Sequence, residues 1–451
     1  MPVILVAGLT PAWQQILCFD SVHPGEVNRA AEVHWCASGK AINAGLALAS
    51  LGGSVHLLSP AGGWSGQAMR DELTQHNVPT TWVATAVATR VCTTVVNRAK
   101  ATSTEFVENA AALTTQELAA FSAEYRTLVS RADFVILTGS LPRGTPVDFY
   151  RRLLQSTPCP ALLDARGAEL LAALDCKPRV VKPNREELAK SVGRPLPDRA
   201  SVLAAMRELV ERGAHSVIVT HGAAGVWVMQ GGDTWEFTPP KVTPDNPIGS
   251  GDCLAAGVAL ALTRGDKLAD AVRLGIAAAT DNVAQLLPAR LALDRVEEFK
   301  SRIPPPTLIL PSSRHLLLPR QLVESMVQHA RAELPNECCG LLAGRRDGDV
   351  LRVEAWYPLV NEAASPIEYR SEPRSMFQAI KRMRQENQEI LAIYHSHPTS
   401  APVPSRTDLA RFYSSDVVHL ILGFAGAEPL MRGWWLTESS YEEATWHVVD
   451  E

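Results

Sequence analysis

The chain is 451 residues long, and 43 Lys and Arg residues against 48 Asp and Glu give it a formal net charge of -5. This length exceeds that of one ordinary domain and predicts two or three domains. An acidic balance without a basic run lacks the electrostatic footprint of nucleic-acid-binding proteins, so we expect no nucleic-acid partner.

The cysteines and the apolar segments indicate where such a protein resides. The eight cysteines are scattered, and no pair has the Cys-x-x-Cys spacing of a redox motif or a zinc knuckle, so we interpret them as reduced thiols. The N-terminus lacks a basic leader followed by a long apolar core, and no segment reaches the roughly 18 apolar residues of a membrane span. The sequence therefore predicts a soluble, cytoplasmic protein without a membrane partner.

The first elements predict a strand, a lid and a helix. Residues 3–8 form a short apolar run typical of a buried strand, and the turn-rich stretch to Trp35 predicts a small second sheet or lid. A small-residue helix then begins after Gly39 and Lys40. A glycine turn at a helix start presents free N–H groups, and the lysine adds charge, so an anionic substrate could bind here. The alternative is a tightly packed helix with a solvent-facing lysine.

Apolar runs alternate with amphipathic helical stretches from Val55 onward, with strands predicted at residues 134–137, 161–163, 180–181 and 217–219. This alternation predicts a largely parallel sheet with helices on both faces. Ligands of such sheets bind at the loops that follow the C-terminal ends of the strands. Four of those loops carry polar side chains in the sequences TGSLPRG, DARG, KPNREE and THGAAG.

The sequence DNPIGSGDCLAAGVALAL predicts a phosphoryl-binding helix start. Gly249, Ser250 and Gly251 lead directly into a small-residue helix, so backbone N–H groups can converge at its positive end and stabilise a transferring phosphoryl group. Asp252 in the first turn could accept the proton of an attacking hydroxyl. The alternative is an ordinary Asp helix cap on a Gly-rich turn.

Residues 2–302 resemble the ribokinase-like sugar kinases of the PfkB family, most nearly the branch of 1-phosphofructokinases and tagatose-6-phosphate kinases. The resemblance is carried by GEVNRA, SGKAIN, Thr89-Arg90, GSLPRG, KPNREEL, THGAAG and NPIGSGD. It implies a ribokinase-like α/β fold, a doubly wound, mostly parallel sheet with a small β lid. It also implies phosphorylation of a sugar or sugar phosphate by ATP and Mg²⁺.

The same resemblance implies roles for individual residues. Asp252 is the implied catalytic base, and Gly249, Ser250 and Gly251 form the implied anion hole. Asn184 and Glu187 are implied to organise Mg²⁺ through water. The implied nucleotide-flanking residues are Thr220, Gly222 and Gly225, and the implied substrate-binding residues are Gln14, Gly39, Lys40, Asn43 and Arg90.

The chain departs from this branch where the sugar is bound. The branch begins with Asn-Pro-Ala-x-Asp, whose Asp binds sugar hydroxyls, whereas this chain has Gln14 there. An amide that both donates and accepts thus replaces a carboxylate. The usual Gly-Gly-Lys-Gly is also altered around Lys40, and Pro247 replaces the Thr of the terminal motif. These changes leave the identity of the sugar undetermined, while Lys40 and Arg90 indicate a phosphorylated acceptor.

A Pro-rich stretch, residues 304–313, predicts an extended connector in place of any regular element. Residues 1–303 are accordingly predicted to form the kinase domain and residues 314–451 a second domain. In the second domain the sequence predicts strands in HLLL, CCGLLAG, ILAIY and VVHLILGF and helices in PRQLVESMVQHARAEL, SEPRSMFQAIKRMRQEN and DLARFYSS.

The second domain contains a candidate zinc site. His395 and His397 follow the apolar run ILAIY, so both imidazoles project from one face if that run is a strand. Prolines then force a loop, after which Ser405 precedes a helical stretch with Asp408. Two imidazoles and one carboxylate leave a tetrahedral zinc ion one position for water, whose pKa falls towards neutrality there. Glu337 is the upstream carboxylate expected to accept its proton.

These residues resemble the JAMM (MPN-plus) zinc metallopeptidases, most nearly small prokaryotic members. The matched features are His-x-His-Pro, a Ser three residues before an Asp, and a Glu before Cys-Gly-Leu-Leu. The resemblance implies a smaller α/β JAMM (cytidine-deaminase-like) domain in which zinc is bound by His395, His397 and Asp408. Glu337 is the implied general base and acid, and Ser405 the implied oxyanion contact. The implied substrate is a peptide or isopeptide bond at a ubiquitin-like or sulfur-carrier protein tail.

Two alternatives concern the metal itself. The His-Ser-His strand end and the Asp helix cap could be structural and hold no metal. Cys338 and Cys339 beside Glu337 could be ligands, but the His-His-Asp set already completes a hydrolytic site.

Together these resemblances imply a bifunctional enzyme, an ATP-dependent carbohydrate kinase fused to a metallopeptidase. One alternative is a catalytically silent kinase fold that serves as a binding or dimerisation scaffold for an active metallopeptidase. Retention of Asp252, Asn184 and Glu187 opposes it, and the altered segment around Gln14 favours it. A homodimer through the lid is common in the wider kinase family.

Overall fold

The computed structural model describes residues 2–231, 233–309, 314–411, 413–426, 428–437 and 440–450. It divides into two compact units, Met1–Gly231 with Trp235–Thr307, and Gly232–Thr234 with Leu308–Glu451. The two units are described separately below, each with its own sheet and hydrophobic core.

The main sheet of the first unit has ten strands in the order β14-β13-β12-β11-β10-β9-β8-β1-β4-β5. The strands from β5 across to β11 pair in parallel, and β12 pairs antiparallel with β11. This arrangement confirms the predicted, largely parallel sheet. The strands are β1 (Val3–Ala7), β4 (Ser54–Ala61), β5 (Thr80–Ala84), β8 (Phe134–Thr138), β9 (Ala161–Asp164), β10 (Val180–Val181), β11 (Ser216–Thr220), β12 (Val226–Gln230), β13 (Asp233–Phe237) and β14 (Thr307–Leu308).

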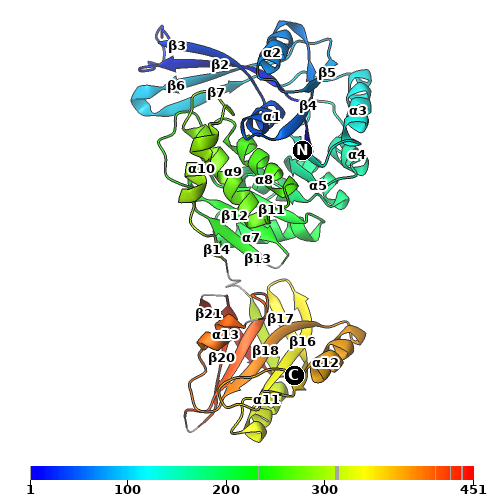
Figure 1. Cartoon of the computed structure of the whole chain (residues 1–451), viewed down its shortest axis with the longest axis vertical. Helices are drawn as coiled ribbons and strands as arrows, with labels where there is room; N and C mark the ends of the chain where they lie inside the picture. Colours follow the sequence, from blue (N-terminus) through cyan, green and yellow to red (C-terminus); the bar gives the residue numbers. More distant parts are fainter. Residues whose placement is uncertain are drawn as a thin grey trace. The chain divides into compact units, whose positions relative to one another are not determined.

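Helices cover both faces of this sheet because parallel strands need crossover connections. Ile4 and Ile136 on one face belong to the core formed with α1, α8 and α9, which lie together in Figure 1. Leu5 and Val135 point to the opposite face and are equally buried. The helices are α1 (Lys40–Ser50), α2 (Gly63–Gln75), α3 (Thr115–Val129), α4 (Phe149–Gln155), α5 (Gly167–Ala173), α6 (Arg185–Val192), α7 (Arg199–Glu211), α8 (Ser250–Thr263), α9 (Leu268–Val283) and α10 (Leu293–Arg302).

A second, four-stranded sheet in the order β3-β2-β6-β7 forms the predicted lid, and we call it the lid sheet. It stands apart from the main sheet in blue and cyan in Figure 1. On its inner face, Ile16, Cys18 and Cys36 pack against Leu286 and Leu287. Its strands are β2 (Ala12–Phe19), β3 (Glu32–Ser38), β6 (Val91–Asn97) and β7 (Thr102–Val107).

The second unit has an eight-stranded sheet in the order β21-β20-β19-β18-β16-β17-β15-β22. Leu342 packs with Met326 of α11 on one face, and Leu341 packs with Met383 of α12 on the other. The elements are β15 (His315–Pro319), α11 (Arg320–Glu333), β16 (Cys339–Asp347), β17 (Val350–Leu359), α12 (Pro373–Gln385), β18 (Glu389–His397), α13 (Arg406–Ala410), β19 (Val418–Gly423), β20 (Leu430–Leu436), β21 (Tyr441–Glu443) and β22 (Thr445–Val449).

Two predicted stretches differ from the structure. The helix predicted in DLARFYSS is α13, which begins two residues earlier, at Arg406, because Ser405 caps its first N–H groups. It ends at Ala410, so residues 413–415 are not helical as predicted. Residues 307–308 of the predicted connector form β14, and residues 310–313 lie outside the described part of the chain. Among the described helices, none combines the length and the apolar character that a membrane crossing requires.

Candidate active sites

A cavity of about 880 Å³ lies at the C-terminal ends of the parallel strands of the first unit. Its walls combine strand-end loops with residues of the lid sheet, as expected for ligand binding in open α/β sheets. Gly225, one of the predicted nucleotide-flanking residues, is not part of the lining. The lining includes the predicted residues Gln14, Gly39, Lys40, Asn43, Arg90, Asn184, Glu187, Thr220, Gly222, Gly249, Ser250, Gly251 and Asp252.

Asp252 lies in the first turn of α8 with its side chain buried. The helix begins after Gly249, whose φ of 82° is favourable only for glycine, so this turn needs that residue. Asn43 Nδ2 donates a 2.8 Å hydrogen bond to Asp252 Oδ2. Burial raises the pKa of Asp252 to about 7, while the positive charge of Lys40 acts in the opposite direction. A carboxylate with this pKa can take up a proton near neutral pH.

Lys40 is the centre of a charged cluster on the cavity wall. Its Nζ lies 3.1 Å from Asp164 Oδ1 and 3.1 Å from Glu187 Oε1. Lys182 Nζ lies 3.2 Å from the second Asp164 oxygen, and both of these side chains are fully or nearly fully buried. Lys40 is therefore held by two carboxylates, which contradicts the alternative of a solvent-facing lysine.

The charges of this cluster stabilise one another. Burial alone lowers the pKa of Lys40, but Asp164 and Glu187 raise it above the ordinary lysine range. Burial alone raises the pKa of Asp164, but Lys182 and Lys40 bring it below the ordinary aspartate range. Lys40 therefore stays cationic and Asp164 stays anionic beside the cavity.

Asp164 and Lys182 were missed as site residues by the sequence prediction. Asp164 ends β9 and Lys182 directly follows β10, so the parallel pairing of these strands brings them together. The sequence did show that Asp164 and Lys182 begin the loops DARG and KPNREE, which follow two predicted strands. Pairing these two opposite charges would also have required the order of the strands, which the sequence analysis did not predict.

Asn184 and Glu187 form the capping box at the start of α6. Asn184 Oδ1 accepts a 2.8 Å hydrogen bond from Glu187 N, and Glu187 Oε2 accepts one of 3.0 Å from Asn184 N. The other oxygen of Glu187 binds Lys40. Both side chains thus lie at the cavity and also fix the helix start.

The predicted substrate-binding residues of the lid side are held by local contacts. Gln14 Nε2 donates to Thr94 Oγ1 at 2.7 Å. Gly39 has a φ of 100°, and a Cβ there would lie 2.9 Å from the Cα of Pro11. The Arg90 guanidinium donates to the backbone carbonyl oxygens of Thr10, Pro11 and Glu108. Arg90 therefore fixes the backbone around the cavity as well as lining it.

In the second unit, His395 and His397 lie at the end of β18 and Asp408 lies in α13. His395 Nε2 is 3.2 Å from His397 Nε2 and 3.2 Å from Asp408 Oδ1. His397 Nε2 is 3.5 Å from the other Asp408 oxygen. The structure thus brings the three predicted ligands together, with their donor atoms converging on one point.

The donor set fits a zinc ion. The Nδ1 atom of His397 lies 3.1 Å from the carbonyl oxygen of Ala401, which can only accept, so Nδ1 carries the hydrogen and Nε2 presents a lone pair. Tyr369 stacks on His395 with ring centroids 4.8 Å apart and so orients the ring. The lone pair of His397 Nε2 and the Asp408 carboxylate at this spacing repel each other unless a cation lies between them.

Glu337 precedes β16 and is 5% exposed. Burial raises the pKa of Glu337 to about 7, although the neighbouring His397 lowers it. Ser405 is the N-cap of α13, and its hydroxyl accepts a 3.2 Å hydrogen bond from Asp408 N. Cys338 and Cys339 are buried, and neither belongs to a candidate ligand group of the described residues.

The comparisons with known proteins agree with this geometry. The family described as pfkB family carbohydrate kinase matches residues 4–289, and prokaryotic homologs of the JAB domain match residues 319–437. Phosphofructokinase-2 from Escherichia coli in complex with fructose-6-phosphate is 28% identical, with a TM-score of 0.61 over 67% of this chain and 99% of that chain. Its tetrameric inhibited form is 27% identical, with a TM-score of 0.62 and the same coverage of both chains.

A candidate 1-phosphofructokinase from Thermotoga maritima is 19% identical, with a TM-score of 0.64 over 68% of this chain and 99% of that chain. At this identity the likeness supports the fold alone. The family matches and the solved structures confirm the ribokinase-like fold class and both predicted family resemblances.

Proposed function

The chain belongs to the pfkB family of carbohydrate kinases, and from this membership we propose that its first unit phosphorylates a sugar phosphate with ATP. The proposal is carried by the position of Asp252, a buried carboxylate beside the Gly249 helix start in a cavity of about 880 Å³. The cationic Lys40 on the same cavity wall favours an acceptor that carries a phosphate. The similarity to a phosphofructokinase bound to fructose-6-phosphate suggests a hexose phosphate.

The transfer follows from the groups around Asp252. The acceptor hydroxyl gives its proton to Asp252 while its oxygen bonds to the terminal phosphorus of ATP, and the bond from that phosphorus to the bridging oxygen breaks. Asn43 holds one oxygen of Asp252, which leaves the other free for the proton. The amides of residues 249–251 at the positive end of α8 stabilise charge on the migrating group. Asn184 and Glu187 would organise Mg²⁺, which would neutralise phosphate charge.

Gln14 determines which acceptor fits. Its amide nitrogen is engaged by Thr94, so we expect the amide oxygen to accept a hydrogen bond from one acceptor hydroxyl. A carboxylate at this position can accept hydrogen bonds from two hydroxyl groups of the sugar. Because Gln14 replaces that Asp, we expect this chain to phosphorylate a different acceptor from the one that kinases with the Asp prefer.

The test is ADP release from Mg-ATP with a panel of free sugars, hexose phosphates and nucleosides. We expect turnover of one phosphorylated acceptor and a loss of about 10²- to 10⁴-fold in Asp252→Asn. Asp270→Asn is the matched control, because Asp270 is an exposed acid in the first turn of the neighbouring helix α9 and should leave the rate unchanged. If no acceptor turns over, the kinase proposal is wrong and the silent scaffold becomes the better account of this unit.

For the second unit we propose hydrolysis of a peptide or isopeptide bond near the tail of a ubiquitin-like or sulfur-carrier protein. The convergence of His395, His397 and Asp408 supports it, together with the match to prokaryotic homologs of the JAB domain. Zinc held by these residues would polarise the carbonyl and activate water. Glu337 takes up the proton and returns it to the leaving nitrogen, and the Ser405 hydroxyl lies at the helix start beside the ligands.

The test for this activity pairs metal analysis with cleavage of a ubiquitin-like protein extended by a short peptide. Glu337→Gln should retain zinc and lose cleavage, whereas His397→Ala should lose both. Cleavage by a protein that contains no zinc would contradict the proposal. Zinc without cleavage of any such fusion would place the substrate outside this class.

We also propose that the chain forms a homodimer through the outer face of the lid sheet. Val33, Trp35 and Phe106 are exposed there, and Trp35 stacks on Trp13 with ring centroids 6.2 Å apart. Apolar side chains gathered on one exposed face of a sheet are typical of protein interfaces. Light scattering should give the mass of a dimer for the wild type and of a monomer for Trp35→Lys; a monomeric wild type would exclude the proposal.

A further inference from the structure

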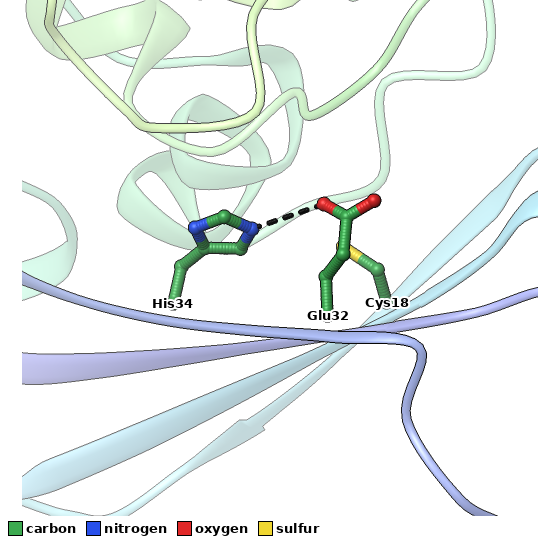
Figure 2. Close-up of side chains that lie close together, drawn as sticks. All are labelled: Cys18, Glu32 and His34. Atoms are coloured by element: carbon green, nitrogen blue, oxygen red, sulfur yellow. Dashed lines mark hydrogen bonds and ion pairs between the residues drawn. The ribbon is translucent and has the colours of Figure 1, made fainter.

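The inner face of the lid sheet carries three potential metal ligands that neither proposed activity uses. Cys18 in β2 pairs directly with Glu32 in β3, and His34 lies two residues further along β3. Side chains two apart on a strand share a face, so all three rise from the same side of the lid sheet, as Figure 2 shows. None of them lines the 880 Å³ cavity.

The ligand atoms of these residues lie within 4.8 Å of one another. His34 Nε2 is 3.2 Å from Glu32 Oε2. Cys18 is 1% exposed, whereas the side chains of His34 and Glu32 are 35% and 45% exposed. The cluster therefore has a buried sulfur at its base and an open side through which an ion and its water can enter.

Arg98 fixes the carboxylate of this cluster. Its Nη2 donates a 2.6 Å hydrogen bond to Glu32 Oε1, so the second oxygen remains directed at His34. Ligating carboxylates are commonly oriented by such an outer hydrogen bond. The carboxylate of Glu32 offsets the single positive charge of Arg98.

We propose that Cys18, Glu32 and His34 form a second metal site that binds a zinc-class divalent ion. Sulfur, imidazole nitrogen and carboxylate oxygen are the donors that zinc takes in tetrahedral sites. Three protein ligands leave the fourth position to water or an external ligand. The ion joins β2 to β3 on the inner face of the lid sheet, independently of the His395, His397 and Asp408 site.

The absorption spectrum of bound Co²⁺ distinguishes the Cys18, Glu32 and His34 site from the His395, His397 and Asp408 site. Cobalt bound by a thiolate gives a near-ultraviolet charge-transfer band, and the His395, His397 and Asp408 set contains no sulfur. The full chain, freed of metal by a chelator, is titrated with Co²⁺. We expect one thiolate band in the wild type, retained in His397→Ala and lost in Cys18→Ser.

Two further variants provide a control thiol and a test of a second ligand. Cys36→Ser is the matched control, because Cys36 is a buried thiol of the same inner face and does not belong to the cluster; its band should be unchanged. His34→Ala changes a partly exposed side chain without disturbing the core and should weaken cobalt binding by at least about tenfold. Absence of a thiolate band at saturating Co²⁺, survival of the band in Cys18→Ser, or unchanged affinity in His34→Ala would each overturn the proposal. So would loss of the band in Cys338→Ser alone.

Discussion

Asn43 of α1 donates a 2.8 Å hydrogen bond to Asp252 of α8, although the two residues are 209 positions apart in the chain. The contact holds one carboxylate oxygen of Asp252, a residue that lines the cavity. Asn43 was predicted to bind substrate, and the structure gives it a contact that also orients the proposed base. The pH dependence of the kinase should therefore depend on both residues.

The pH profile of the wild-type kinase should have an acidic limb near pH 7. Burial raises the pKa of Asp252 to about 7, and only the deprotonated carboxylate accepts the hydroxyl proton. Below this pKa, kcat/KM should fall about tenfold per pH unit, and above it the rate should level off. Steady-state ADP release between pH 5 and 9 measures this limb. A rate that does not change between these pH values would contradict the role of Asp252.

Asn43→Ala should move that limb to higher pH. The amide hydrogen bond favours the charged carboxylate, so its loss raises the pKa of Asp252 further. A hydrogen bond to a charged group contributes about 1.5–3 kcal/mol, which corresponds to a shift of about one pH unit or more. Ser38→Ala is the control, because the Ser38 hydroxyl bonds the other end of the Asn43 amide and does not contact Asp252. A reduced rate with an unmoved limb would assign Asn43 to substrate binding alone.

Asp164→Asn should strongly destabilise the first unit. The substitution leaves the buried Lys182 and the partly buried Lys40 without their shared anion, and breaking a buried ion pair costs about 3–5 kcal/mol. Asp148→Asn is the control, because the Asp148 to Arg152 pair is largely exposed and should contribute at most about 1 kcal/mol. Denaturant unfolding followed by far-ultraviolet circular dichroism compares the two. Equal unfolding midpoints for both variants would show that the ion pairs of Asp164 do not stabilise the first unit.

The sequence was most informative where ligands lie close together in the chain. Strand alternation placed His395 and His397 on one face, the following helix start made Asp408 a candidate, and the JAMM resemblance grouped the three. Asp252 was predictable for the same reason, since its helix start is encoded by the residues directly before it. The roles of these residues remain predictions, but their grouping was available from local pattern.

Contacts between distant segments were not available from local pattern. The ion pairs of Asp164 with Lys40 and Lys182 join three segments, and only the strand order of the sheet brings these residues together. Cross-strand pairing likewise creates the group of Cys18 and Glu32, because no spacing in the sequence specifies that β2 and β3 pair in this register. Finding the Asp164 ion pairs or the Cys18 and Glu32 group would have required a predicted strand order with explicit register.

Gly39→Ala should destabilise the first unit more than Gly25→Ala does. Both glycines have a positive φ, at 100° and 85°, so each substitution introduces backbone strain of about 1–2 kcal/mol. A Cβ at Gly39 would also lie 2.9 Å from the Cα of Pro11, whereas nothing lies within 4 Å of a Cβ at Gly25. The comparison isolates the close approach of the α1 start to the strand β2 start. Equal unfolding midpoints for the two variants would show that strain alone limits this position.

Removal of zinc should separate the two proposed activities. The residues proposed to hold Mg-ATP and those proposed to hold zinc belong to different units, and no residue is shared between the cavity lining and the ligand group. A zinc-selective chelator should therefore abolish peptide cleavage and leave ADP release unchanged, and added zinc should restore cleavage. Asp408→Ala should reproduce the chelated state without any chelator, because it removes the carboxylate that approaches both imidazoles. If ADP release fell in parallel with cleavage in Asp408→Ala, the two sites would be coupled and their independence would be wrong.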